Sequence, residues 1–225
     1  MLRLNELAIM GRVLLSGLAI AAVFWATGQA SAQTDAVTVE EVRTASVKGF
    51  RTAMFGMGEA AVSEAIIADF GVETADITAS NNAVERTRLL TVSVPDLLEG
   101  GGRAQVSYIF GYKSEALIQV GVSWNAQIDP ETTGKQLVAN GDVLSAHFLD
   151  LGFAPATVTI NSPVANGILL FRGLDPDGAA AILLMQGTYE EIENGQNSLK
   201  PTGLALLYSV DPDAPDIFRL KEGSF

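Results

Sequence analysis

Cysteine is absent from this chain of 225 residues, and histidine occurs once, at position 147. The lack of cysteine excludes disulfide scaffolds, Cys-ligated zinc, iron–sulfur clusters, c-type haem attachment, a cysteine nucleophile and the lipid-bearing cysteine of a bacterial lipoprotein. A single histidine excludes a metal site built from several histidines of one chain.

Basic residues are few, with 14 Lys and Arg against 26 Asp and Glu, which gives a net charge of −12. Nucleic acids and anionic lipids attract basic surfaces, so neither is expected as a partner. Hydrophobic residues make up 48% of the chain, which is too many for a disordered protein and enough for a folded core. No motif predicts a cofactor.

The first residues have the layout of a secretory signal. Arg3 and Arg12 precede an apolar run from Val13 to Ala26, and Ala30 and Ala32 form the A-x-A pattern that signal peptidase accepts. We expect cleavage after Ala32 and a periplasmic or secreted protein. The alternative is an uncleaved anchor, because a run of about 20 residues is long enough to span a bilayer. Association with a membrane is expected only if this helix is retained.

The rest of the chain divides into three parts. Residues 33–46 are polar and predict a flexible arm. Residues 47–127 and 128–225 each predict one helix-plus-antiparallel-sheet unit. Neither unit has enough apolar area to be stable alone, so we expect an α+β fold in which both share one core.

In the first unit, Gly58 and Gly71 bracket a short helix whose apolar residues recur at four-residue steps. Alternating residues then predict three antiparallel strands, at about 88–95, 106–112 and 118–124. Trp124 continues the apolar series of the last strand, which places it in the core rather than at a ligand site.

The second unit repeats this arrangement. Asp129-Pro130-Glu131 predicts the start of a helix, with Asp129 as its N-cap, and Gly152 predicts its end. Strands are expected at about 157–160, 168–172, 179–186 and 204–210, with Asp175-Pro176-Asp177-Gly178 as a turn. The common order of elements suggests an internal duplication.

One segment carries a resemblance. Gly56-Met57-Gly58-Glu59-Ala60-Ala61-Val62 resembles the opening of the small outer-membrane assembly lipoproteins of the SmpA/OmlA type, and the doubled helix-plus-sheet arrangement is similar to the tandem fold of beta-lactamase inhibitor proteins. The chain departs from both, with Gly58 in place of a Thr or Ser cap and with no lipoprotein cysteine or disulfides. The resemblance implies a fold and a periplasmic setting and carries over no functional residue.

Candidates for chemistry are sparse. His147 lies at the border of the apolar stripe of the second helix, and no G-x-S-x-G motif accompanies it. Gly100-Gly101-Gly102 lacks the Lys-Ser/Thr of a phosphate-binding loop. The Asp-Pro-Asp segments at 175–177 and 211–213 favour turns, with a weak calcium contact as the alternative. We assign no catalytic, cofactor-binding or metal residue.

The strands of the second unit are apolar on both faces, although one short helix is available to cover them. An antiparallel sheet with one wet face should alternate, so one face is either buried within the chain or is an interaction surface. We expect a protein partner, or self-association, to use this sheet. The candidate residues are Leu204, Leu206, Leu207, Ile182 and Leu184.

These observations favour a non-enzymatic binding or envelope-associated protein. An accessory subunit of a membrane complex, tethered by an uncleaved N-terminal helix, is the first alternative. An enzyme that uses carboxylates is the second.

Overall fold

The computed structural model describes residues 44–192, 196–220 and 223. The predicted signal peptide and residues 33–43 of the predicted arm lie outside them. At the end of that arm, Ala45 is buried in the core, and its N–H donates to Gly152 O at 3.2 Å. The chain is therefore anchored two residues earlier than Val47, where order was expected to begin.

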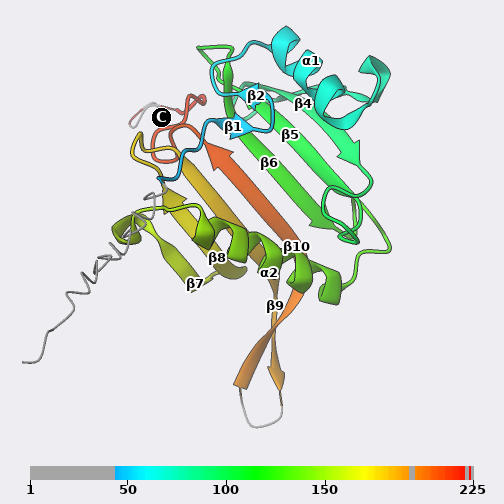
Figure 1. Ribbon diagram of the computed structural model, residues 1–225, viewed down its shortest axis with the longest axis vertical. Helices are drawn as coiled ribbons and strands as arrows, with labels where there is room; N and C mark the ends of the chain where they lie inside the picture. Colours follow the sequence, from blue (N-terminus) through cyan, green and yellow to red (C-terminus); the bar gives the residue numbers. More distant parts are fainter. Residues whose placement is uncertain (1–43, 193–195, 221–222, 224–225) are drawn as a thin grey trace, which may run out of the picture. The chain divides into compact units, whose positions relative to one another are not determined.

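An eight-stranded antiparallel sheet forms the centre of the fold, in the order β3-β4-β5-β6-β10-β9-β8-β7 (Figure 1). Its strands are β3 (Thr78–Asn82), β4 (Thr87–Val94), β5 (Ala104–Phe110), β6 (Leu117–Asn125), β7 (Thr159–Val164), β8 (Gly167–Leu174), β9 (Ala180–Ile192) and β10 (Gln196–Ser209). A separate two-stranded hairpin comprises β1 (Gly49–Phe50) and β2 (Ala53–Met54).

Each half of the chain contributes four consecutive strands to this sheet, and the last strands of the two halves, β6 and β10, pair at its centre. In each half a helix precedes the strands: α1 (Glu59–Phe70) or α2 (Gly134–Asp150). A glycine with positive φ follows each helix, at 64° for Gly71 and 83° for Gly152, and a short 3-10 helix comes next (η1, Thr74–Asp76; η2, Pro155–Thr157). The same elements thus occur twice in the same order, as a duplication predicts.

Helix α1 has the predicted bounds. Gly58 is its N-cap and Gly71 its left-handed C-cap, whose N–H donates to Ile67 O. Its buried residues are Val62, Ala65 and Ile66.

Helix α2 begins later than predicted. Its N-cap is Thr133, which forms a capping box with Gln136, and not Asp129. The Asp129 carboxylate instead accepts the backbone N–H groups of Arg103 and Glu131, at 3.1 Å each. The Asp-Pro-Glu segment is therefore a turn that precedes the helix. The Asp129 carboxylate, which was expected to cap the helix, instead holds the loop that contains Arg103.

Two strand predictions need correction. The first half has four sheet strands and not three, because β3, made of Thr78-Ala79-Ser80-Asn81-Asn82, has no hydrophobic alternation to reveal it. Strand β9 continues through Glu190 and Glu191, beyond the predicted end of this strand at about residue 186. Cross-strand pairing with β10 keeps them extended, and Lys200 Nζ lies 3.0 Å from Glu190 Oε1.

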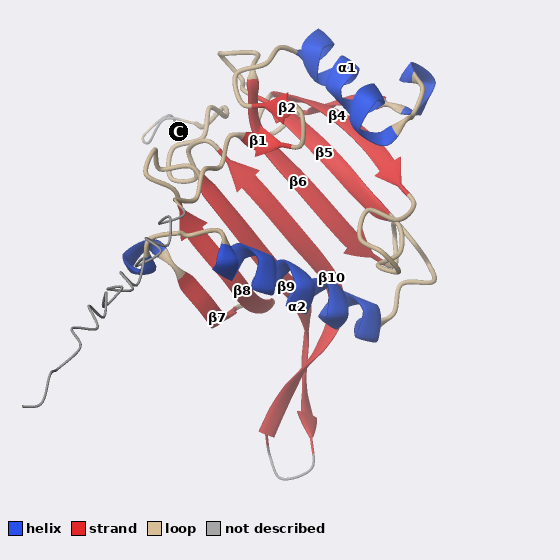
Figure 2. Cartoon of the chain, viewed as in Figure 1, coloured by secondary structure: helices blue, strands red, loops and turns tan. Residues whose placement is uncertain are grey.

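A single hydrophobic core contains residues of both halves, which confirms that they share it. Trp124 is 1% exposed at the central strand pair, as predicted. In the second half, Phe171 stacks on Phe148 of α2, with ring centroids 5.2 Å apart, and contacts the tilted ring of Phe153 at 5.3 Å. The fold is α+β, with helices and a β-hairpin packed on one face of the sheet (Figure 2).

Candidate functional site

The sheet has one face that no helix or strand of the described residues covers. Helices α1 and α2 and the β1–β2 hairpin all lie in front of the sheet as Figures 1 and 2 show it. We call the opposite side the open face. Because side chains alternate along a strand, every second residue of each strand belongs to it.

Cross-strand register arranges the open-face residues in rows across the sheet. One row contains Leu169, Leu184, Ala205, Ser123, Gln105 and Ser93. The next row contains Arg172, Ile182, Leu207, Gly121, Ser107 and Thr91. Each row thus runs from mainly aliphatic residues in the second half to hydroxyl and amide side chains in the first half.

Five half-buried aliphatic residues of these rows, which we call the open-face strip, lie side by side on β8, β9 and β10. They are Leu169, Ile182, Leu184, Ala205 and Leu207. A contiguous apolar surface without a covering element is typical of an interaction site.

The residues predicted as an interaction surface fall on both faces. Ile182, Leu184 and Leu207 lie on the open face and belong to the strip. Leu204 and Leu206 lie on the covered face, where they are 1% and 3% exposed. Strand alternation explains the division, since Leu206 and Leu207 are neighbours in sequence and must point in opposite directions.

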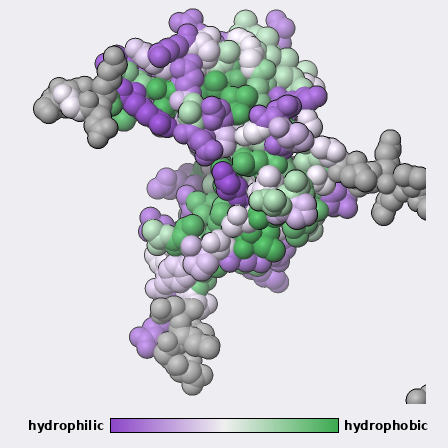
Figure 3. Space-filling view, turned by 90° about the vertical axis from the view of Figure 1, so that its left-hand side faces the viewer, coloured by the Kyte–Doolittle hydropathy of each residue, from purple (hydrophilic) through white to green (hydrophobic). Residues whose placement is uncertain are grey.

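Charge is almost absent from the two rows, whose one charged residue is Arg172. Its Nη2 lies 3.9 Å from Asp213 Oδ1, in the segment that follows β10. At the end of one row, Arg103 Nη1 lies 3.4 Å from Ser93 Oγ. The chain as a whole has a net charge of −12, so the two rows form an area of little charge on an acidic molecule. The edge beside it also has apolar residues: Ile160 and Val164 of edge strand β7 are 50% and 40% exposed. Figure 3 views the molecule from the side facing left in Figure 1 and shows green hydrophobic patches between purple hydrophilic residues.

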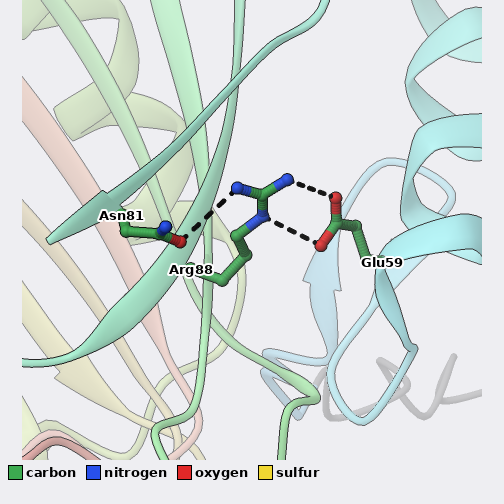
Figure 4. Close-up of polar contacts among 3 residues, drawn as sticks. All are labelled: Glu59, Asn81 and Arg88. Atoms are coloured by element: carbon green, nitrogen blue, oxygen red, sulfur yellow. Dashed lines mark hydrogen bonds and ion pairs between the residues drawn. The ribbon is translucent and has the colours of Figure 1, made fainter.

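A second candidate is a polar cavity of about 780 Å³ between the start of α1 and the β3–β4 turn. Arg88 and Glu59 form a two-pronged ion pair there, with Nε–Oε2 and Nη2–Oε1 distances of 3.0 Å (Figure 4). Arg88 Nη1 also lies 3.4 Å from Asn81 Oδ1. These side chains satisfy one another within the protein.

Electrostatics in this cavity do not favour acid–base chemistry. The hydrogen bond from Arg88 lowers the pKa of Glu59, so Glu59 stays ionised at neutral pH and is a poor proton donor. The Arg86 guanidinium lies 3.7 Å from the centroid of the Phe218 ring, a cation–π contact that holds the C-terminal segment against the turn.

Carboxylates of the Asp-Pro-Asp segments are occupied by backbone donors. Buried Asp175 accepts from Val47 N at 2.8 Å, and from Asp177 N and Ala179 N at 3.0 and 2.9 Å. Asp211 accepts from Ala214 N at 2.8 Å. Within the described ranges, no group of three or more His, Asp or Glu side chains is arranged to hold a metal ion. The two segments act as turns.

The glycine loop and the histidine have structural surroundings. Gly100 and Gly102 have φ values of 67° and 77°, and Asn140 Nδ2 of α2 donates to Gly101 O at 2.9 Å. His147 contacts Phe148 edge-on, with centroids 5.4 Å apart. Among the described residues, no serine forms a hydrogen bond with His147, as a serine nucleophile activated by this imidazole would require.

Sequence reasoning missed the polar half of the open face. The sequence feature that could have revealed it is a set of outward strand positions that carry Ser, Thr, Gln or Gly. Solvent-facing positions of strands commonly carry Lys or Glu instead. Thr91, Ser107, Gln119 and Ser123 all follow this pattern. The absence of charge at outward positions is therefore the feature that could have revealed the whole face.

Comparison with protein families, curated proteins and solved structures found no match to this chain. Among the described residues, no helix is both long enough and apolar enough to cross a membrane. The resemblance to assembly lipoproteins and to beta-lactamase inhibitor proteins stays a prediction.

Proposed function

We propose that this chain is an exported, non-enzymatic binding protein whose open face binds a protein partner. The observation that carries the proposal is the pair of uncharged rows across the sheet, aliphatic on β8 to β10 and hydroxyl- and amide-bearing on β4 to β6. The complementary partner surface is uncharged, with apolar residues opposite the open-face strip and hydrogen-bonding groups opposite Ser107 and Ser123.

Charge distribution supports a neutral protein surface as the ligand. A molecule with a net charge of −12 repels acidic macromolecules, and this repulsion is weakest where the surface itself is uncharged. Interface centres are depleted in charged residues, which the two rows match.

Two observations support binding rather than catalysis. The Glu59 carboxylate in the polar cavity is paired with Arg88 and has a lowered pKa. The Asp175 and Asp211 carboxylates serve turns. A reaction that used carboxylates would require one of them to be released from these contacts.

The site of action follows from the predicted signal peptide, which indicates the periplasm or the exterior. Intact-mass measurement of the protein from its native cells tests this part. We expect a chain that begins at Gln33. A mass that includes residues 1–32 would contradict cleavage and would favour the alternative, an accessory subunit tethered by its N-terminal helix.

The neighbouring residues Leu206 and Leu207 provide a matched test of the open face. Leu206→Glu places a charge in the core beneath α2 and should unfold the protein, as measured by circular dichroism. Leu207→Glu places the same charge on the open face and should leave the fold intact while it abolishes partner binding. If both substitutions unfold the protein, the open face is buried and the proposal fails.

Site-specific photo-crosslinking in the native cells identifies the occupant. A crosslinking amino acid at 207 or 184 should yield the same adduct, and Ile182→Glu should remove it. The same amino acid at Val138, which is 43% exposed on α2, is the control and should not form this adduct. Equal adducts from all three positions would contradict the proposal. An adduct of twice the chain mass would show that the open face binds a second copy of this chain and not a different protein.

A further inference from the structure

A cleft of about 330 Å³ lies on the covered face, between α2 and the β1–β2 hairpin. Its lining includes Trp124, Leu206 and Tyr208 of the central strands β6 and β10. Phe50 of the hairpin and Val143 and His147 of α2 also line it. The cleft therefore lies where the two halves of the sheet meet and where neither helix covers the central strands completely. Its volume is in the range of small-molecule sites, which are mostly apolar and contain a few polar groups.

Two residues that line this cleft, Trp124 and Tyr208, have polar groups with no hydrogen-bond partner among the described residues. Trp124 Nε1 is fully buried and unpaired. The Tyr208 ring contacts Phe50 and Phe148, and the His147 imidazole, which lines the same cleft, contacts Phe148. An unpaired buried N–H costs about 1–3 kcal/mol in a folded protein, so an occupant with an acceptor atom would remove this cost.

Arg51, which also lines the cleft, has a guanidinium that is already engaged. Arg51 Nη1 donates to Asp69 O at the end of α1, at 2.8 Å, and its guanidinium lies 4.6 Å from the Phe70 ring centroid. Asp69 itself accepts from Thr52 Oγ1 at 2.9 Å, so a carboxylate accompanies the guanidinium. The local charges balance, which favours a neutral occupant over an anion.

We infer that this cleft binds a small, neutral, aromatic or otherwise flat apolar molecule that carries a hydrogen-bond-accepting oxygen. The apolar body lies between Phe50 and Val143, over Tyr208, and the oxygen accepts from Trp124 Nε1 or Tyr208 Oη. This site does not involve the open face, so it stands or falls independently of the proposed protein partner.

Prodan, a neutral naphthalene ketone whose fluorescence reports a dry environment, is a suitable probe. We expect the full chain to bind it saturably. Val143 and Val138 are exposed valines of the same helix, at 59% and 43%, but only Val143 lines the cleft. Val143→Phe should fill the cleft and lower the affinity at least tenfold, whereas Val138→Phe should bind as the wild type does. Both variants should keep the wild-type melting temperature.

A second comparison tests the acceptor. Dimethylaminonaphthalene has the rings of prodan without its ketone, and it should bind the wild type more weakly. Substituting Trp124→Phe together with Tyr208→Phe should reduce prodan affinity to that of the ketone-free compound and leave the latter unchanged. Circular dichroism confirms that this variant is folded.

Three results would overturn the inference. One is equal binding by the Val143→Phe and Val138→Phe variants. Another is that the Leu207→Glu variant loses prodan binding while the Val143→Phe variant keeps it, which would show that prodan binds to the open face. The third is a folded Trp124→Phe, Tyr208→Phe variant with unchanged affinity for both compounds.

Discussion

At the scale of single residues, Trp124 combines a ring that fills the core with an indole N–H that has no hydrogen-bond partner among the described residues. Its ring fills the centre of the core at the β6–β10 pair, where Trp124 lies opposite Leu204. Its N–H has no partner. The side chain therefore stabilises the protein through its volume rather than through a hydrogen bond.

Truncation of this side chain should be costly. Trp124→Ala removes a fully buried aromatic ring and leaves a cavity, so we expect the free energy of unfolding to fall by about 3–5 kcal/mol. Trp124→Phe, which keeps an aromatic ring, should cost much less. Urea titration at equilibrium measures both values, and a small loss for the alanine variant would show that the core collapses around the site.

Asp216 predicts a pH dependence. Its carboxylate accepts backbone N–H groups, foremost that of Ser114 at 2.8 Å, and these bonds hold its pKa below the ordinary value. A folded-state pKa that is lowered stabilises the protein above the unfolded-state pKa, about 3.9 for Asp, and this contribution is lost as the pH falls through the folded-state value.

Asp216→Asn should therefore lower the melting temperature at pH 7. The difference from the wild type should shrink as the pH falls from about 4, where the unfolded-state carboxyl takes up a proton, through the lower folded-state pKa. Thermal melts from about pH 2.5, below the ordinary Asp pKa, to about pH 7, well above it, measure the difference. A difference that is constant over the whole range would show that the carboxylate charge is not the cause.

At the scale of elements, the ends of the two helices differ in how well they are capped. α1 begins at Gly58, which offers no side-chain acceptor, whereas α2 begins at Thr133 with a capping box. The difference matters for α2 because it is the helix that packs on β8, β9 and β10 and forms one wall of the cleft.

Thr133→Ala should lower the free energy of unfolding by about 1 kcal/mol, because the N-terminal N–H groups of α2 lose an acceptor. If the helix began at Asp129, the same substitution would be nearly neutral. The reverse change at the other helix, Gly58→Ser, should stabilise the protein by a few tenths of a kcal/mol. Chemical denaturation of both variants measures these effects.

Elements with strong local signals were predictable, and those that depend on long-range contacts were not. The bounds of α1 followed from Gly58 and Gly71, and the alternation of β4 to β6 was visible. The start of α2 was wrong because Asp129 is used by Arg103, a residue 26 positions away. Strand β3 escaped prediction because pairing with β4, and not its own composition, makes it a strand.

The residues predicted as an interaction surface also depended on long-range contacts that the sequence does not show. Alternation identified Leu206 and Leu207 as opposite-facing residues, but the side on which α2 packs cannot be inferred from the strand alone. That information resides in tertiary contacts, which also bring Leu184 and Ser123 into one row through Ala205.

For the whole molecule, the central β6–β10 pair makes the two halves interdependent. A chain that ends at Gln127 would expose the β6 edge and remove α2, which contributes Leu144 and Phe148 to the shared core. We expect this fragment to lack a cooperative melting transition, because one half buries too little apolar surface. A cooperative melt of the fragment at low concentration would refute the shared-core interpretation.

The β9–β10 hairpin projects beyond its neighbours (Figure 1). β10 pairs with β6 only over Gly203–Ser209, and β9 pairs with β8 only over residues 180–186, so the remainder of each strand pairs solely with the other. The outer ribbon can therefore fray while the eight-stranded sheet stays intact. Amide protons of Thr188 and Lys200 should exchange with solvent through this local opening, on a far shorter timescale than those of Leu204 and Leu206, which are released only when the whole molecule unfolds.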